Sequence, residues 1–246
     1  MPGSRTLELG RIVVIGAGRL GRALARALGD AGLPAVGPLG RERSEQSFDS
    51  ADVVLLCVPD GAIASVAASI PVGPLVGHCS GALTLDALEP HEGFSLHPLV
   101  AATPRGADFA GAACAIASRT AAGRDVAFAL ARRLGMQAID IADRDRALYH
   151  ASASMASNFL VTLEAEAERL GAAVGLERRH LAHLAQSALS AWAALGGAAL
   201  TGPIARGDEA TVARQRSAVA ERASRVLPLW DCLAQSTREL AAERRE

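Results

Sequence analysis

Short apolar runs alternate with amphipathic stretches through the first 142 residues of the chain. Residues 11–15 and 51–58 are apolar and rich in β-branched side chains, which is typical of strands buried on both faces. The same reasoning predicts shorter strands near 33–37, 74–78, 112–117 and 136–142, and helices over 16–28, 62–69 and 121–134. Strands that alternate with helices in this way predict an α/β domain with a Rossmann-type parallel sheet and helices on both faces.

The pattern changes near Asp143, and no strand pattern follows it. Residues 146–170 contain neither Pro nor Gly and predict one long helix, with Gly171 as its C-cap. Further helices are predicted over 177–195, 209–225 and 229–244. We therefore expect two domains, a Rossmann domain over 1–145 and an all-helical domain over 146–246.

Composition limits the classes of function. A chain of 246 residues with 50% hydrophobic and 21% charged residues suits two globular domains. The net charge is −1 without a long block of either sign, so no nucleic-acid partner is expected. No apolar run reaches the roughly 18 residues of a membrane span, and the first residues lack the apolar core of a signal peptide. We expect a cytoplasmic protein without a membrane partner.

Cysteine and lysine usage narrow the chemistry. The four cysteines have no paired spacing, which predicts neither a metal site nor a disulfide framework: Cys57, Cys79, Cys114 and Cys232. Cys57 lies in an apolar run and is predicted to be a small core residue. The chain contains no lysine. Mechanisms that need a catalytic lysine, such as the Tyr-x-x-x-Lys pair of short-chain dehydrogenases, are thereby excluded.

A glycine-rich turn, Gly16-Ala17-Gly18-Arg19-Leu20-Gly21, connects the first predicted strand to the first helix. In a dinucleotide-binding turn the first Gly permits the tight bend, the second lets the backbone approach a pyrophosphate, and the third lets helix and strand pack closely. Free N–H groups and the helix dipole then hold the phosphates. The alternative is a glycine-rich turn without a ligand.

The loop after the second predicted strand favours NADP over NAD. NAD sites usually carry an acidic residue there, whereas position 38 is Pro and Arg41, Arg43 and Ser44 follow. Arginine forks suit a 2′-phosphate, although Glu42 opposes this and a solvated charged loop is the alternative. Val58 and Pro59, after the third strand, are expected to border the cofactor.

The candidate catalytic residues lie after predicted strands or apolar stretches and near the start of the long predicted helix. His97, in a loop before Pro98, is the first candidate to exchange a proton, with Ser80 orienting the reacting oxygen. His78 is expected to be structural. Three further polar residues share a spacing of four on the long helix, which places them on one face: His150, Ser154 and Asn158.

The segment between the second and third helices of the helical domain carries the last candidate. Arg206 would bind a substrate carboxylate or pair with a nearby acid, and Asp208 is predicted to cap the next helix. The segment also suits an ordinary connector.

Several strings along the chain together resemble Rossmann-like proteins with the DUF2520 C-terminal domain: Gly16–Gly21, Val58-Pro59-Asp60, His78-Cys79-Ser80-Gly81, Ser95-Leu96-His97-Pro98, Tyr149-His150 with Asn158, and Leu200–Asp208. The resemblance implies kinship with the 6-phosphogluconate, ketopantoate, pyrroline-5-carboxylate and prephenate dehydrogenase group. It also implies a 6-phosphogluconate dehydrogenase-like helical domain that often forms dimers. Ser80 and His97 match a serine and a His-Pro histidine of prephenate dehydrogenases. The helix lysine of standard ketopantoate reductases is missing, and His150 or Ser154 stands near its place.

Together these features predict an NADP-dependent oxidoreductase that acts on a small carboxylate-bearing ketone or alcohol, with a ketopantoate-like compound as the first expectation. His97, Ser80 and His150 are its catalytic candidates, and Asn158, Ser154 and Arg206 its substrate-binding candidates. The alternatives are an imine reductase of the pyrroline-5-carboxylate kind and a non-catalytic NADP(H)-binding sensor. A homodimer through the helical domain is expected, and no metal.

Overall fold

The computed structural model describes residues 9–42 and 48–244. It divides into two compact units, Met1–Ser157 and Asn158–Glu246. The predicted domain boundary, between residues 145 and 146, lies 12 residues before the division between these units, which falls after Ser157.

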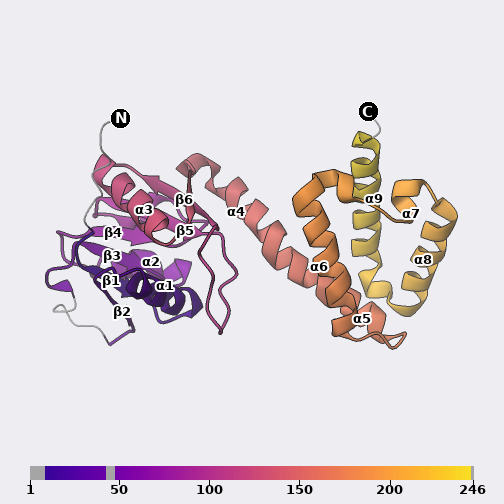
Figure 1. The fold of residues 1–246 in the computed structure, drawn as a ribbon, viewed down its shortest axis with the longest axis horizontal. Helices are drawn as coiled ribbons and strands as arrows, with labels where there is room; N and C mark the ends of the chain where they lie inside the picture. The colour runs from indigo at the N-terminus through magenta and orange to yellow at the C-terminus, as the bar shows by residue number, and fades with distance from the viewer. Residues whose placement is uncertain (1–8, 43–47, 245–246) are drawn as a thin grey trace. The chain divides into compact units, whose positions relative to one another are not determined.

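The first unit contains one seven-stranded sheet (Figure 1). Its strands are β1 (Ile12–Ile15), β2 (Ala35–Leu39), β3 (Val53–Leu56), β4 (Leu75–His78), β5 (Gly93–Pro98), β6 (Ala113–Ser118) and β7 (Gln137–Asp140). They lie in the order β2-β1-β3-β4-β5-β6-β7, and every neighbouring pair is parallel except β5 with β6. The Rossmann-type α/β class is therefore confirmed, with one antiparallel pair that the prediction of a parallel sheet lacked.

Helices cover both faces of the sheet, as the apolar strands require. On one face α1 (Arg19–Asp30) and α3 (Ala121–Arg133) bury Leu24, Leu28 and Leu130 against the strands. On the other face α2 (Asp60–Ala67) and the 3₁₀ helix η2 (Leu85–Leu88) bury Ile63 and Leu88. Strands β1 and β3 are buried along their whole length because both of their faces are covered.

The strand order places a switch point between β1 and β3. The chain passes from β1 to β2 on one side, and then returns to pair β3 with the other side of β1. In open α/β sheets, ligands bind in the crevice at the carboxyl ends of the strands beside such a point. The glycine turn follows β1 and residues 57–59 follow β3, so both lie at this edge of the sheet.

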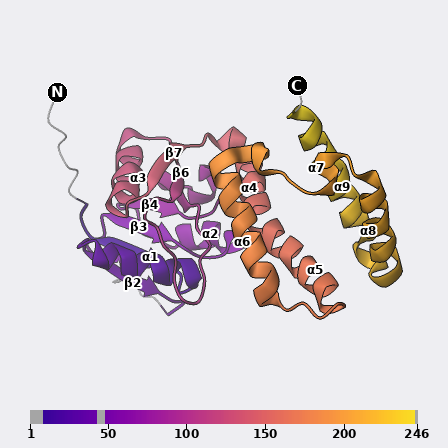
Figure 2. The same ribbon diagram turned by 45° about the vertical axis from the view of Figure 1, so that its right-hand side comes forward.

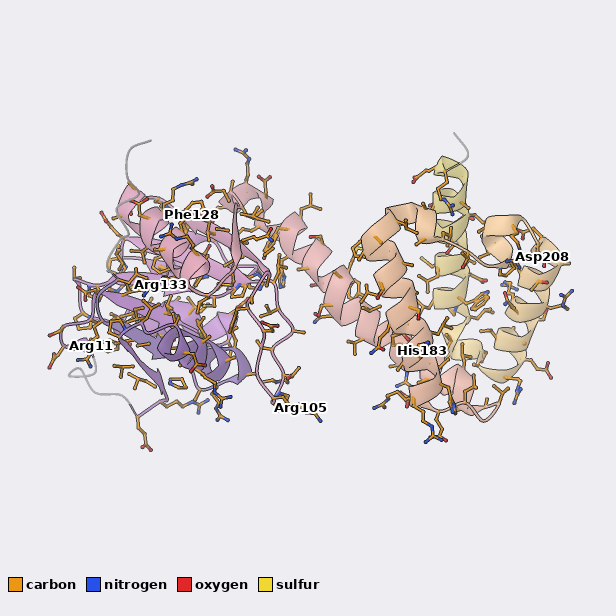
Figure 3. All side chains as sticks on the ribbon, viewed as in Figure 1. Arg11, Arg105, Phe128, Arg133, His183 and Asp208 are labelled. Carbon is orange, nitrogen blue, oxygen red and sulfur yellow. The ribbon has the colours of Figure 1, made fainter. Side chains whose placement is uncertain are left out.

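The second unit is helical throughout its described residues. Its helices are α5 (Leu160–Ala172), α6 (Arg178–Leu195), α7 (Pro203–Arg206), α8 (Glu209–Arg222) and α9 (Leu227–Glu243), with 3₁₀ turns η5 (Gly196–Ala199) and η6 (Ser224–Val226). Helices α5 and α6 lie side by side (Figure 2), and α9 packs against α7 and α8. The predicted cap of α8 is confirmed, since Asp208, labelled in Figure 3, accepts a hydrogen bond of 3.0 Å from the Thr211 N–H.

The predicted single helix over 146–170 is wrong in two respects. A π-helical segment, η4 (Met155–Phe159), separates α4 (Arg146–Ser154) from α5. Because a π turn holds more residues than an α turn, spacing by four no longer places Asn158 on the face of His150 and Ser154. Gly171 is also not a C-cap, because it lies within α5, which ends at Ala172.

Candidate functional site

The glycine turn has the geometry of a dinucleotide-binding turn. Gly16 has a φ of 113°, and a Cβ atom there would overlap the carbonyl oxygen of Cys57. A Cβ atom at Gly21 would overlap the carbonyl oxygen of Gly16, so α1 packs directly on the turn. At Gly18 nothing lies within 4 Å of the Cβ position, which leaves this backbone open to a ligand.

The first turn of α1 is available to an anion. Its N-cap, Gly18, has no side chain, and no acidic residue occupies the first turn. The leading N–H groups of a helix have no partner within the helix, and its dipole favours negative charge at this end. Gly18, Arg19 and Leu20 therefore offer a cradle that fits a pyrophosphate.

A basic hollow of about 970 Å³ adjoins this turn. It is lined by Ala17 and Gly18, by the outer face of α1, and by the loop that connects β5 to β6. Four arginines reach it, and none forms an ion pair with any residue that the structure describes: Arg19, Arg22, Arg26 and Arg105. Figure 3 labels Arg105 on that loop. Asp30 and Asp108 also line the hollow, but the excess of positive charge suits an anionic ligand.

The predicted 2′-phosphate loop is described only in part. Arg41 is exposed after β2, and the neighbouring Glu42 is exposed as well. Arg43 and Ser44 lie outside the described residues. On the far side of the switch point Val58 is half-buried and Pro59 caps the N-terminus of α2.

His97 lies in strand β5 and not in a loop, which corrects the prediction. Its Nδ1 atom is 2.5 Å from the hydroxyl oxygen of Tyr149 on α4. Its ring also lies edge-on to that of His150, with the ring centroids 6.2 Å apart. Strand β5 escaped prediction because Gly, Ser, His and Pro interrupt its apolar residues.

Both partners of this hydrogen bond are neutral at pH 7. Burial, and then the neighbouring charges of His150 and Arg146, lower the pKa of His97 to about 4. Burial raises the pKa of Tyr149 to about 12. The sequence suggested His97 because an ordinary histidine titrates near neutrality. The structure instead provides a neutral imidazole hydrogen-bonded to a phenol, a pair able to pass a proton through the ring.

Gly81 lies between the two histidines. A Cβ atom at this position would be 2.7 Å from Cε1 of His97 and 2.7 Å from Cδ2 of His150. Any side chain there would therefore displace the rings. The glycine of the His78-Cys79-Ser80-Gly81 string thus allows the loop after β4 to contact the His97 and His150 rings directly.

Ser80 and Arg146 hold this loop in place. The Ser80 hydroxyl oxygen accepts hydrogen bonds from the N–H groups of Ala82 and Leu83, each 3.1 Å long. Arg146, only 1% exposed, donates to the Ser80 carbonyl oxygen and to the Ser95 hydroxyl of β5, and it pairs with Asp143. Ser80 therefore has a structural role in its turn, and its catalytic role stays a prediction.

The other predicted site residues are divided between the two units. His150 and Ser154 are half-buried on α4 in the first unit. Asn158 is exposed in η4 and belongs to the second unit. Arg206, at the end of α7, lines a hollow of about 350 Å³ together with Thr201, Gly202 and Arg244. The substrate-binding roles of Ser154, Asn158 and Arg206 stay predictions.

Sequence reasoning assigned no role to Arg146, and it named Tyr149 only as part of the family resemblance. One signal was present, because Arg146, Tyr149 and His150 are spaced by three and four residues on a predicted helix and so share a face. Tyr149 is also the only tyrosine in the chain. The partners of these residues on β5 were not predictable without the fold.

His78 makes the first unit sensitive to acid. It is fully buried, its Nδ1 accepts from the Ser80 N–H, and burial lowers its pKa to about 4. The unfolded chain therefore binds more protons between pH 6.5 and 4, so stability falls as the pH drops through that window. The Asn side-chain oxygen in His78→Asn can accept the same hydrogen bond but does not titrate. Between pH 6.5 and 4, we therefore expect the free energy of unfolding to fall by about 3 kcal/mol less in this variant than in the wild type.

Urea unfolding at pH 6.5 and at pH 4, monitored by circular dichroism, would measure this change in the free energy of unfolding for each protein. His91→Asn, three residues after η2 in the first unit, is the matched control and should keep the wild-type pH dependence. Equal losses in His78→Asn and the wild type would contradict the assignment.

The sheet order, the switch-point glycine turn and the helical second unit define a class, that of Rossmann-type proteins with a helical C-terminal domain. A family model described as "Domain of unknown function (DUF2520)" matches residues 112–237. The chain belongs to the DUF2520 family. The match begins at the last two strands of the sheet and extends into α9, so it spans parts of both units.

Solved structures share the fold at low identity. A Bacteroides fragilis protein with a proposed NADP oxidoreductase activity is 22% identical with a TM-score of 0.77, over 94% of this chain and 99% of that one. A Thermotoga maritima protein is 22% identical with a TM-score of 0.74, over 96% and 100%. Pyrroline carboxylate reductase from Plasmodium falciparum, solved with NADP bound, is 13% identical with a TM-score of 0.62, over 96% and 99%. No curated protein matches the chain.

Proposed function

We propose that this protein is an NADP-dependent oxidoreductase that acts on a small carboxylate-bearing substrate. The observation that carries the proposal is the glycine turn at the switch point. At Gly16 and Gly21 the neighbouring backbone leaves no room for a side chain, whereas Gly18 faces open space at the N-terminus of α1. The turn is therefore tightly packed except at the helix N-terminus, where free backbone N–H groups can bind phosphates.

The residues fit the cofactor at both of its charged parts. Gly18, Arg19 and Leu20 would hold the pyrophosphate, and Arg41, with Arg43 and Ser44 by prediction, the 2′-phosphate. Val58 and Pro59 would border the ribose on the β3 side of the switch point. When bound, NADPH supplies a hydride to the carbon that is reduced.

Two observations concern the substrate. The arginines of the basic hollow, which form no ion pair within the described part of the chain, favour an anion, in keeping with a carboxylate. His97 would donate the proton on its other ring nitrogen to a carbonyl oxygen of the substrate. The Tyr149 hydroxyl would at the same time give its proton to Nδ1 of His97, so the net donor is the phenol. We therefore place a ketone first, as in a ketopantoate-like substrate.

A second candidate is the reduction of a cyclic imine. Its protonated form already carries the proton that a ketone needs from the protein. A site whose histidine has a pKa of about 4 and whose tyrosine has a pKa of about 12 is a weak acid at neutral pH, which favours such a substrate. The similarity of the fold to that of a pyrroline carboxylate reductase supports this candidate.

Cofactor preference provides the first test. NADPH should bind more tightly than NADH, because arginines follow β2 where NAD sites carry an acid. Arg41→Ala and Arg43→Ala should each weaken NADPH binding by about 1.5–3 kcal/mol if the side chain contacts the phosphate, and leave NADH binding unchanged. Titration calorimetry would measure both cofactors. Arg133→Ala, at the end of α3, is the control. Equal affinities for NADPH and NADH would refute the preference.

A substrate panel provides the second test. Oxidation of NADPH would be followed by absorbance with small keto acids and cyclic imino acids. Turnover of a keto acid supports the first candidate, and turnover of an imine alone supports the second. Tight NADPH binding without any turnover would instead support the non-catalytic sensor.

We also propose a homodimer through the helical unit. Large apolar side chains are exposed at the end of η4 and on α5 and α6: Phe159, Val161, Leu163, Leu184, Leu189, Trp192 and Leu195. By length and composition the stretch Arg178–Arg206 would suit a membrane span, and none of its apolar window is buried. His183 and Gln186 are exposed among these side chains, a mixture that suits a protein interface better than lipid. The dimerisation implied by the family resemblance supports a second copy as the partner.

Trp192→Asp should dissociate this dimer. An aromatic residue that is 60% exposed in one chain and buried between two is a typical hot spot, so we expect the dimer Kd to rise at least about 30-fold. Sedimentation velocity over a concentration series would measure it. Val72→Asp, at an 85% exposed position of the first unit, is the matched control and should leave the Kd unchanged. A wild type that is monomeric at high concentration would disprove the proposal.

A further inference from the structure

Two cysteine thiols meet at the switch-point edge of the sheet. Cys57 follows β3 and Cys79 follows β4, and the parallel register pairs Leu56 with His78 immediately before them. The Cys79 N–H donates to the Leu56 carbonyl oxygen over 3.0 Å, so the pairing continues to the cysteines. Their Sγ atoms are 3.5 Å apart. In sequence they are too far apart to suggest a pair, and only the sheet brings them together.

The spacing of neighbouring strands allows a covalent bond. Strands lie about 4.7–4.9 Å apart, within the range of Cα separations that a disulfide spans. The two sulfur atoms need to approach by about 1.5 Å to reach the S–S bond length of about 2.05 Å. All four cysteines lie in the described part of the chain and are free thiols, and there only Cys57 and Cys79 have their sulfur atoms in contact.

The two thiols differ in accessibility. Cys57 is half-buried and within reach of a small oxidant, whereas Cys79 is only 6% exposed. The hydrogen bond from Cys57, and then burial, raise the pKa of Cys79, so this thiol stays protonated. Cys57 is therefore the residue that reacts first, and Cys79 is positioned to react with the product.

We propose that Cys57 and Cys79 form a reversible disulfide on exposure to hydrogen peroxide, and that this bond weakens dinucleotide binding. The Cys57 thiolate attacks one oxygen atom of the peroxide, the O–O bond breaks, and hydroxide departs. Cys57 is thereby converted to a sulfenic acid. The Cys79 sulfur then attacks the Cys57 sulfur and loses its proton, while the S–O bond breaks and water leaves. In sum, two thiols and one peroxide give one disulfide and two waters. A dithiol reductant reverses the reaction by thiol–disulfide exchange.

The effect on binding follows from contacts of Cys57 with the glycine turn, and this part rests on the proposed function. The Cys57 carbonyl oxygen occupies the space beside Gly16 that a side chain would need, and the Cys57 Cβ is 3.1 Å from the Cβ position of Gly21. Drawing Cys57 toward Cys79 therefore shifts the wall of the turn that would hold the pyrophosphate.

Mass spectrometry of the full-length protein tests the bond itself. After peroxide treatment the mass of the protein should fall by two hydrogens, and alkylation of the unfolded, oxidised protein should then modify only two of the four cysteines. Treatment with dithiothreitol before alkylation should allow all four to be modified. Cys57→Ser should abolish the disulfide, and Cys232→Ser, which removes an exposed cysteine of the helical unit, should retain it. Oxidation of Cys57 to a sulfinic acid without a link, or a link that requires Cys232, would overturn the proposal.

Calorimetry on the same samples tests the coupling. The disulfide form should bind NADPH about 5–150-fold more weakly than the reduced form, and Cys57→Ser should not change after peroxide treatment. By linkage, saturating NADPH should shift the thiol–disulfide ratio in a glutathione buffer by the same factor toward the thiols. An unchanged NADPH affinity in a protein shown by mass to be disulfide-linked would overturn the coupling. Absence of NADPH binding in the reduced protein would refute the proposed function, while the mass measurement still decides whether the bond forms.

Discussion

His97→Ala should lower turnover by about 10²–10⁴-fold and leave NADPH affinity nearly unchanged. Positioned proton transfer contributes an effect of this size, and His97 is the half-buried imidazole whose Nδ1 contacts Tyr149. The glycine turn that would hold the phosphates follows a different strand, so cofactor binding should survive. The measurement is steady-state turnover on the substrate found by the panel, beside calorimetry with NADPH.

Tyr149→Phe separates a proton relay from a histidine that acts alone. In a relay the phenol replaces the proton that His97 donates, so Tyr149→Phe should also lose turnover, and the double variant should lose little more than His97→Ala. Additive losses would indicate independent roles. For a substrate that arrives as an iminium ion, both variants should retain most of their turnover.

His150→Ala is the matched control, because its ring also lies beside Gly81 and His97 but makes no hydrogen bond to Tyr149 among the described contacts. A loss of activity in His150→Ala, with full activity in His97→Ala, would reverse the two roles.

Gly18→Val should abolish most dinucleotide binding without unfolding the protein. Nothing lies within 4 Å of a Cβ atom at Gly18, so the fold accepts a side chain there, but the branched group occupies the space in front of the helix N–H groups. Loss of two hydrogen bonds to a charged phosphate costs at least about 3 kcal/mol, or a hundredfold in Kd. Calorimetry should show this for NADPH and NADH alike, with an unchanged circular dichroism spectrum.

Gly29→Val is the control for this variant. Gly29 lies on the same helix, and its Cβ position is equally free of neighbours, so the same side chain is introduced away from the turn. Its NADPH affinity should equal that of the wild type. Normal cofactor binding by a folded Gly18→Val protein would show that the glycine turn does not hold a dinucleotide.

The fold was predictable where the hydrophobic pattern is strong. Apolar β-branched runs predicted β1 and β3, and periodic stretches predicted α6, α8 and α9. Strand β5 was missed because its polar residues and terminal Pro98 give no apolar run, and its antiparallel pairing with β6 depends on the route of the loop between them. Nothing in the sequence of 155–159 distinguishes a π turn from an α turn, so η4 could not be predicted.

The candidate site was predictable only where it is local in sequence. The glycine turn is six consecutive residues, and its roles for Gly16, Gly18 and Gly21 follow from backbone sterics alone. The His97–Tyr149 hydrogen bond joins residues from a strand and a distant helix, and the Cys57–Cys79 contact depends on the pairing of β3 with β4. The low pKa of His97 could not be predicted either, because it results from burial of the ring, which depends on the packing of the folded chain.

The hydrogen bonds that buried Arg146 donates to Ser80 and Ser95 have a consequence for how the two units can be recombined. Arg146, Tyr149 and His150 fall within the stretch that the family model matches, yet they lie in the compact unit that contains the sheet. A chimaera that exchanges helical halves with a relative after Ser157 would carry the guanidinium, the phenol and both imidazoles with the sheet. A junction at residue 145 would instead leave His97 with a foreign helix. Grafting experiments can therefore change the second unit while the His97–Tyr149 hydrogen bond and its neighbours stay together.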